Sequence, residues 1–138
     1  MEGSSSTDSP IPNRRVIEMK IELQHLPDKD LSPNKRFHHM PVYRAKRSAK
    51  YEMMWLVMEQ GVPKEPMQKA KIDITFIASD KRRRDLDNLF SSMKAYIDGL
   101  VEVGLLWDDS ADRVTYTIRY ELGEKPNTII NIQEVSDE

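Results

Sequence analysis

The chain has 138 residues, of which 38% are hydrophobic and 32% are charged, with 5 Gly and 8 Pro. This length and balance are typical of one globular domain and exclude a collagen, a coiled-coil rod and a disordered acidic tail. The chain contains no Cys, which excludes a disulfide scaffold, a Cys-ligated metal and thiol catalysis, so any metal must bind carboxylates or imidazoles. No stretch is apolar enough for a membrane span or a secretory signal, so we expect a cytoplasmic protein.

Positive charge is concentrated in two segments, although the formal net charge is only −2, from 21 Lys and Arg against 23 Asp and Glu. The segment from Ser32 to Tyr51 contains six Lys or Arg and no acidic residue, and the run Lys81–Arg84 places four cations beside Asp85. A charge run is often a solvated surface, but four consecutive cations at the junction of two elements favour a phosphate contact. Both segments are therefore candidate contacts for a polyanion.

The N-terminal third of the chain predicts one strand and a long loop. Residues 1–13 are small and polar and indicate a flexible leader, followed by a single domain over residues 14–138. Apolar and polar residues alternate from Val16 to Gln24, the period of a half-buried strand. The segment from Leu26 to Arg44 contains three prolines among polar and basic residues, which predicts an irregular surface loop.

A helix is predicted from about Ala45, with Gly61 as its C-terminal stop. Large apolar side chains recur at helical spacing within it, and we expect this stripe to face the core. The methionine and aromatic stripes of the chain, Met93 included, are better explained as core than as contacts of a cofactor. The residues of the predicted helical stripe are Tyr51, Met54, Trp55 and Met58.

The C-terminal half predicts three strands and a second helix. Residues 71–78 are rich in β-branched and aromatic side chains and indicate a strand buried on both faces. An apolar stripe predicts a helix over residues 87–103, and alternation predicts strands over residues 114–120 and 128–135. The order β-α-β-α-β-β indicates an α+β fold with two main helices and a small mixed sheet in a single domain.

Four aspartates flank the second helix. Asp85 and Asp87 are two residues apart before it, so in extended backbone their side chains share a face, and Asp108 and Asp109 follow it. Hard cations such as Mg²⁺ take oxygen ligands, usually one or two carboxylates with waters and phosphate oxygens, so these residues suit a divalent metal. Which elements would bring the second pair back to the first is not evident from the sequence.

The helix itself contributes a lysine. At 100° per residue, Lys94 and Asp98 lie on the same helix face as Asp87, where Lys94 would hold a phosphate or orient a water. Each of these features also has a structural explanation. Aspartates before a helix are good caps, a Lys and an Asp four residues apart form ordinary surface pairs, and Asp108 with Asp109 would suit a turn.

These residues resemble the RusA family of Holliday-junction resolvases, which are crossover junction endodeoxyribonucleases often carried by phages and prophages. The resemblance covers most of the chain, and the fold order agrees with it. It implies a homodimer with one active site per subunit that nicks a four-way junction symmetrically in DNA recombination and repair. The segments that carry the resemblance are Ser32–Arg36, Arg82–Leu89, Lys94 with Asp98–Leu100, and Gly104–Asp109.

The resemblance also implies roles for individual residues. Asp85, Asp87 and Asp109 would bind the catalytic Mg²⁺, or Mn²⁺ in its place, with Asp108 and Asp98 as supporting carboxylates. Lys94 would be the essential lysine. In the familiar form of the family the lysine follows the aspartates more closely, whereas here residues 90–93 intervene; the assignment rests on the spacing of Lys94 to Asp98, which is kept.

Two functions remain open from the sequence. The first is a Mg²⁺-dependent endonuclease that recognises branched DNA by shape and backbone charge. The second is a non-catalytic protein that binds junctions or single strands through the same basic surface, with its carboxylates serving as helix caps. In either case the residues expected to contact DNA are Lys35, Arg36, Arg44, Lys46, Arg47, Arg82, Arg83 and Arg84.

Overall fold

The computed structural model describes residues 16–32 and 39–136, with the side chains of residues 39–41 left undescribed. The predicted leader over residues 1–13 lies outside the described residues, as do the predicted DNA contacts at Lys35 and Arg36. In the described part, the elements follow the predicted order of strand, helix, strand, helix, strand and strand, with the second helix divided in two. The chain is therefore a single α+β domain.

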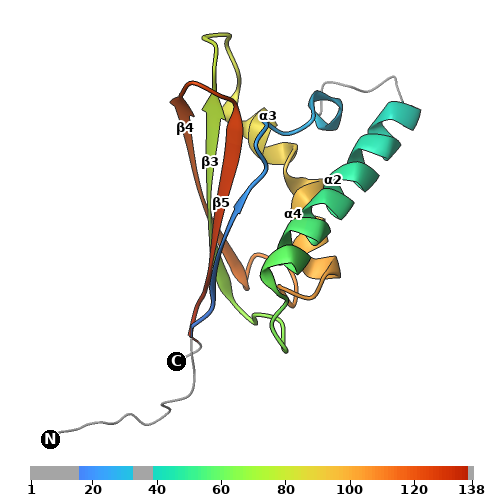
Figure 1. Cartoon of the computed structure of the whole chain (residues 1–138), viewed down its shortest axis with the longest axis vertical. Helices are drawn as coiled ribbons and strands as arrows, with labels where there is room; N and C mark the ends of the chain where they lie inside the picture. Colours follow the sequence, from blue (N-terminus) through green and yellow to red (C-terminus); the bar gives the residue numbers. More distant parts are fainter. Residues whose placement is uncertain (1–15, 33–38, 137–138) are drawn as a thin grey trace, which may run out of the picture.

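Four strands form one mixed sheet in the order β2-β5-β3-β4 (Figure 1). The strands are β2 (Glu18–Glu22), β3 (Ala70–Ala78), β4 (Val114–Leu122) and β5 (Asn127–Glu134). Strand β3 pairs in parallel with β4 and antiparallel with β5, which in turn pairs antiparallel with β2. A parallel pair needs a crossover, and the second helical region supplies it between β3 and β4.

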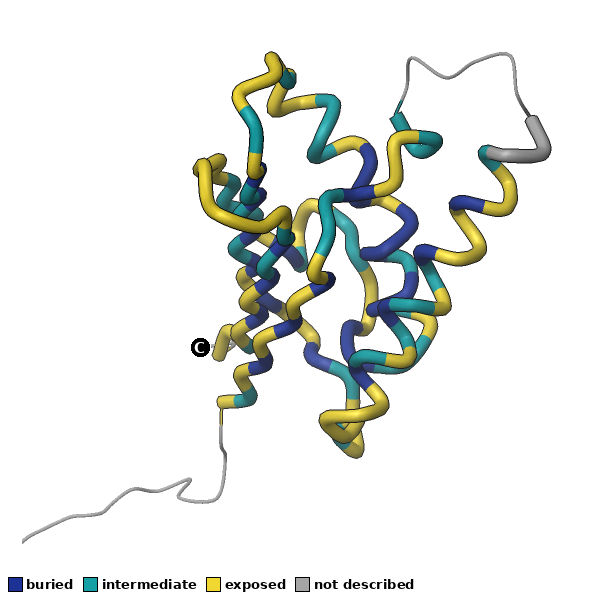
Figure 2. The backbone as a smooth tube through the Cα atoms, turned by 45° about the horizontal axis from the view of Figure 1, so that its top comes forward, coloured by how far each residue is buried: buried dark blue, intermediate teal, exposed yellow. Residues whose placement is uncertain are grey.

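The three α-helices of the described chain cover one face of the sheet (Figure 1). They are α2 (His39–Gln60), α3 (Leu86–Ser91) and α4 (Lys94–Glu102). Along β3, every second residue is buried on the side of these helices (Figure 2). The residues that alternate with them are partly or fully exposed. The prediction that β3 is buried on both faces is therefore wrong, because nothing in the described chain covers the second face. No helix among the described residues is long and apolar enough to cross a membrane.

Helix α2 buries a different face from the predicted one. Its core side is formed by residues at intervals of four, and Met53 and Val57 are completely buried. Trp55 is instead 60% exposed, and Tyr51 and Met58 are about half exposed. The small residues Ala45 and Ala49 on the core side allow a close approach to α4, which the large side chains of the predicted stripe would prevent. The helix also begins at His39, within the predicted loop, with Pro41 in its first turn, where proline is tolerated.

The second helical region is broken between α3 and α4, so the predicted continuous helix is wrong. Ser92 and Met93 form a turn, in which the Ser92 hydroxyl donates to the carbonyl oxygen of Asn88 at 2.9 Å. Such a side-chain bond to the carbonyl four residues earlier commonly bends a helix. Met93 is fully buried, as predicted. Because of the break, Asp87 belongs to a different helix from Lys94, and the single predicted face through both residues does not form.

His25 connects the segment after β2 to α2. Its Nδ1 lies 2.6 Å from the carbonyl oxygen of Leu26 and its Nε2 lies 2.7 Å from Glu52 Oε2, so only the doubly protonated ring donates to both. Burial lowers the pKa of His25, but the hydrogen bonds to Leu26 and Glu52 together raise it above its ordinary value of 6.5.

We expect Glu52→Gln to destabilise the fold more at pH 5.5 than at pH 8.5. A raised histidine pKa stabilises the folded state below pH 6.5, and this contribution is lost as the pH rises through the folded-state pKa. Since the pair is partly exposed, the difference should be below about 1 kcal/mol. Urea unfolding of both proteins at the two pH values measures it, and an equal effect at both would show that His25 is not charged in the folded state.

Candidate functional site

Lys94 connects α4 to the loop that follows it. It is the first residue of α4, and its Nζ donates to Asp109 Oδ2 at 2.8 Å and to Asp98 Oδ1 at 3.0 Å. The pairing with Asp98 agrees with the predicted helical spacing. The chain after α4 turns back along that helix before it enters β4, which brings Asp109 to Lys94 but leaves it in a separate pocket from Asp85.

The ion pairs fix the charge of Lys94. The hydrogen bond that Lys94 donates to Asp109, followed by the one it donates to Asp98, raises the pKa of the lysine well above its usual value of 10.5. Lys94 therefore remains an ammonium group at every physiological pH. Its side chain is still 67% exposed, compared with 22% for the side chain of Asp109, so the cation is accessible to a ligand while the carboxylate is sheltered.

Tyr116 on β4 lies beside this cluster and was not predicted as a site residue. A pocket of about 400 Å³ is lined by Lys94, Asp109 and Tyr116 together with the apolar side chains of Phe90 and Ile97. The rings of Phe90 and Tyr116 are in edge-to-face contact at 5.0 Å between centroids. Burial, and then the nearby charge of Asp109, raises the pKa of Tyr116 to about 12, so its hydroxyl keeps its proton. Strand alternation placed Tyr116 in the sheet, but no sequence signal linked it to the aspartates.

Asp85 and Asp87 lie at the start of α3. Asp85 occupies the N-cap position in extended backbone, but its side chain makes no capping hydrogen bond. Its carboxylate instead lies 3.5 Å from Asn88 Nδ2 and 3.6 Å from a guanidinium nitrogen of Arg83. Asp87 is exposed and accepts only the adjacent N–H of Asn88 at 2.9 Å. The Asp85 carboxylate thus contacts two side chains and makes no hydrogen bond to the helix amides, so capping does not account for it.

The structure does not gather all the predicted metal ligands. Asp85 lines a pocket of about 530 Å³ at one end of α3, whereas Asp109 lines the separate pocket at the other end, and Asp108 is exposed beside it. No group of three His, Cys, Asp or Glu residues suitable for a metal ion forms within residues 16–32 and 39–136. Carboxylate oxygens are the right donors for Mg²⁺, which is often held by only one or two of them. The donor chemistry therefore fits a hard cation, but a set of three ligands does not form.

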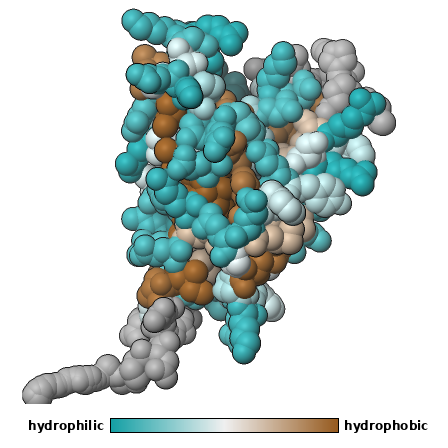
Figure 3. Space-filling model, viewed as in Figure 1, coloured by the Kyte–Doolittle hydropathy of each residue, from teal (hydrophilic) through white to brown (hydrophobic). Residues whose placement is uncertain are grey.

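The arginines of the basic loop after β3 differ in how far they are exposed. Arg84 makes two hydrogen bonds to the carboxylate of Asp80, at 2.8 and 3.2 Å, and is only 18% exposed. This guanidinium, together with the backbone N–H of Arg82, lowers the pKa of Asp80 to about 2. Arg82 and Arg83 are 80% and 91% exposed. Hydrophilic side chains cover this end of the sheet (Figure 3). Asp80, four residues before Arg84, is a structural partner that was not predicted.

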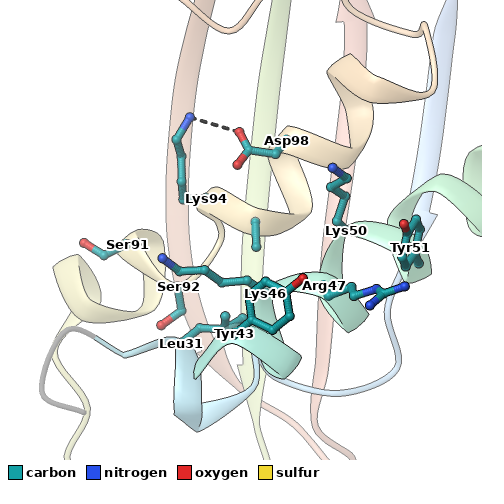
Figure 4. Close-up of a pocket in the computed structure, with 11 residues that line it drawn as sticks. Leu31, Tyr43, Lys46, Arg47, Lys50, Tyr51, Ser91, Ser92, Lys94 and Asp98 are labelled. Atoms are coloured by element: carbon teal, nitrogen blue, oxygen red, sulfur yellow. Dashed lines mark hydrogen bonds and ion pairs between the residues drawn. The ribbon is translucent and has the colours of Figure 1, made fainter. Parts of the chain in front are cut away.

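A groove of about 710 Å³ separates α2 from the junction of α3 and α4 (Figure 4). Lys46 extends from α2 towards Ser91 and Ser92, and Lys50 and Arg47 follow it along the helix (Figure 4). Arg44 is exposed on the same helix. The groove also reaches Lys94, which it shares with the pocket of Asp109. Of the predicted basic contacts on α2, Lys46 and Arg47 thus line a groove that reaches the lysine of the candidate site, whereas Arg44 does not line it.

The chain has no match among the models of known protein families or among the curated proteins. The roles of the site residues are therefore argued from their geometry and chemistry alone.

Proposed function

We propose that the protein is a metal-dependent endodeoxyribonuclease that recognises branched DNA and resolves four-way junctions by symmetric nicking, the activity of the RusA family that its sequence resembles. The observation that carries the proposal is the contact of Lys94 with Asp109 and Asp98. Surface ion pairs contribute little to stability, so a lysine held between two carboxylates beside a basic groove is better explained by a role in binding phosphate.

The chain's carboxylates divide into two groups around α3. On this proposal Asp85, Asp87 and Asp109 are the ligands of Mg²⁺ or Mn²⁺, with Asp108 as a supporting carboxylate. The structure places Asp85 and Asp109 in separate pockets at the two ends of α3, so binding of one ion by both groups requires them to move closer together. The chemistry that such an ion supplies when bound is activation of a water molecule and neutralisation of charge on the leaving oxygen. Lys94 keeps Asp109 in position through its 2.8 Å contact, and its exposed ammonium group can bind the scissile phosphate.

DNA binding would use the two cationic surfaces on either side of the carboxylates. Arg82 and Arg83 form ion pairs of 3.6 Å with Asp80 and Asp85, but their side chains are largely exposed and can contact phosphates. Arg84 orders their loop through Asp80. The exposed cations of α2, Arg44, Lys46 and Arg47, form the second surface. A junction with two-fold symmetry needs two cuts, and a homodimer would supply two sites related by the same symmetry.

The test compares a labelled four-way DNA junction with a linear duplex of matching sequence. The protein is incubated with each substrate in Mg²⁺, in Mn²⁺ and in chelator, and the products are separated on a denaturing gel. We expect paired, symmetric nicks in the junction that require the divalent ion, and little product from the duplex. A junction that is bound but never nicked, under any divalent ion, would contradict the proposed activity.

The second candidate function is a non-catalytic protein that binds junctions or single-stranded DNA. It is favoured by one observation: within the described part of the chain, no three metal-ligating side chains come together. Such a protein would bind DNA with a strong dependence on salt but almost none on Mg²⁺. The same gel, together with a retardation assay in chelator, separates the two candidates.

A further inference from the structure

The outer face of α2 carries a row of aromatic and cationic side chains. Tyr43, Arg47, Tyr51 and Trp55 are spaced four residues apart, so they form one ridge with steps of about 6 Å along the helix. All four are exposed, with 58% of Tyr43 and 60% of Trp55 accessible. The Arg47 guanidinium lies over the ring of Tyr51, 5.7 Å from its centroid. We refer to these four residues as the α2 ridge.

This exposure is unusual for side chains of this size. Exposed large apolar groups in a row, rather than scattered singly, mark a binding surface. The core does not need them, because the opposite face of α2 already buries Met53 and Val57. The cation–π contact also holds the ring of Tyr51 in place, so part of the entropy cost of binding a planar ligand is met in advance.

The positive charge around the α2 ridge indicates which kind of partner it binds. Between Val42 and Tyr51 the helix carries four cations and no carboxylate. The groove that Tyr43, Arg47 and Tyr51 of the ridge line is also lined by Lys46 and Lys50 (Figure 4). These cations outnumber the acidic neighbours, which are Asp98 in the groove and Glu102, 3.6 Å from Lys50. A second copy packed by two-fold symmetry on this face would set these cations against one another, which is unfavourable. A polyanion is the complementary partner.

We propose that the α2 ridge binds single-stranded DNA, with unpaired bases stacked on Tyr43, Tyr51 and Trp55 and the phosphates bound by Lys46 and Lys50. Aromatic rings interleaved with cations are the usual surface for single strands, because rings can stack only on bases that are not already stacked in a duplex. The inference rests on the proposed function, in that an opened branch point supplies such bases. The groove then leads the strand towards Lys94.

Trp55 makes the stacking directly measurable. The chain has two tryptophans, and Trp107→Phe leaves Trp55 as the sole reporter. In this background, titration with an oligo(dT) of about 15 nucleotides should quench Trp55 fluorescence, and a blunt duplex of the same length should quench it far less. Tyr51→Ala should weaken oligo(dT) binding about tenfold. In the unmodified chain, Trp55→Ala should have a similar effect when binding is followed by the anisotropy of labelled oligo(dT).

Charge variants test the phosphate contacts separately. Lys46→Gln and Lys50→Gln should each reduce the slope of log affinity against log salt by about one. Lys125→Gln, at an exposed position in the turn between β4 and β5, is the matched control and should leave the slope unchanged. Circular dichroism of every variant confirms that the fold is retained, since all the substituted side chains are exposed or partly exposed.

Three outcomes would overturn the inference. Trp55 fluorescence that does not respond to oligo(dT) excludes stacking, and equal quenching by duplex excludes selectivity for single strands. If Trp55 fluorescence changes with protein concentration in the absence of DNA, the ridge binds a second copy of the chain instead. These failures are distinct from failure of the nuclease: a protein that nicks junctions but ignores oligo(dT) loses only this inference, and one that binds oligo(dT) through Trp55 but never nicks loses only the proposed activity.

Discussion

Replacing Asp109 by Asn is expected to reduce divalent-ion-dependent nicking of a four-way junction by at least about a hundredfold. The amide oxygen of Asn can still accept the hydrogen bond from Lys94, so the geometry of the cluster should survive while its negative charge is lost. Junction binding should be unchanged or tighter, because removal of a carboxylate reduces repulsion of the phosphates. Single-turnover nicking and gel retardation measure the two effects independently.

The control for this substitution lies in the same loop. Asp112 is exposed and its carboxylate accepts a hydrogen bond from Ser110 Oγ at 2.7 Å, with no contact to Lys94. Asp112→Asn therefore removes an equal charge without altering the candidate site, and it should nick at the rate of the unmodified protein. If the two variants nick equally well, Asp109 has no part in the reaction and the metal site must lie elsewhere.

Replacing Gly99 by Val is expected to lower the free energy of unfolding by about 3 kcal/mol. A Cβ at this position would lie 2.6 Å from the backbone oxygen of Lys50 and 3.0 Å from Cβ of Met53, so α2 and α4 would have to separate. Gly99→Ala introduces the same clash but gains about 1 kcal/mol of helix propensity, so its loss should be smaller. Urea unfolding provides the measurement.

Ser48→Val is the matched control for Gly99. Ser48 is exposed on α2, so a valine there meets no neighbouring backbone and should change stability by less than about 0.5 kcal/mol. A Gly99→Val protein as stable as this control would show that the two helices are not in the close contact that the structure describes.

The sequence predicted the sheet better than the helices. All four strands were located to within a few residues. Residues 71–78 were recognised by their β-branched and aromatic side chains, and the other strands by alternation, because a strand with one buried face repeats every two residues whatever it packs against. The buried face of α2 could not be found in the same way. Ala45 and Ala49 are small, and they are buried only because α4 approaches closely at Gly99. Tyr51 and Trp55 are larger, so the sequence pattern wrongly indicated that they face the core.

The candidate site shows the same limit. The pairing of Lys94 with Asp98 follows from helical periodicity within one element, so the sequence predicted it. The contact of Lys94 with Asp109 depends on the path of the chain between α4 and β4, and the partnership of Arg84 with Asp80 depends on a turn, so neither could be derived from spacing. The break at Ser92 removed Asp87 from the predicted face because a hydroxyl bond overrode an otherwise regular apolar pattern.

The strand order makes the candidate site independent of the pairing of β2. Every residue of the aspartate and lysine cluster lies between β3 and β4, which pair in parallel and, with the helices between them, form one continuous β-α-β unit. Closing a chain segment of this length costs less entropy than bringing the ends of the chain together. Strand β2, by contrast, is an edge strand held by β5 from the opposite end of the sequence. Fraying of the β2 edge would therefore leave the pairing of β3 with β4, and with it the contacts of Lys94, in place.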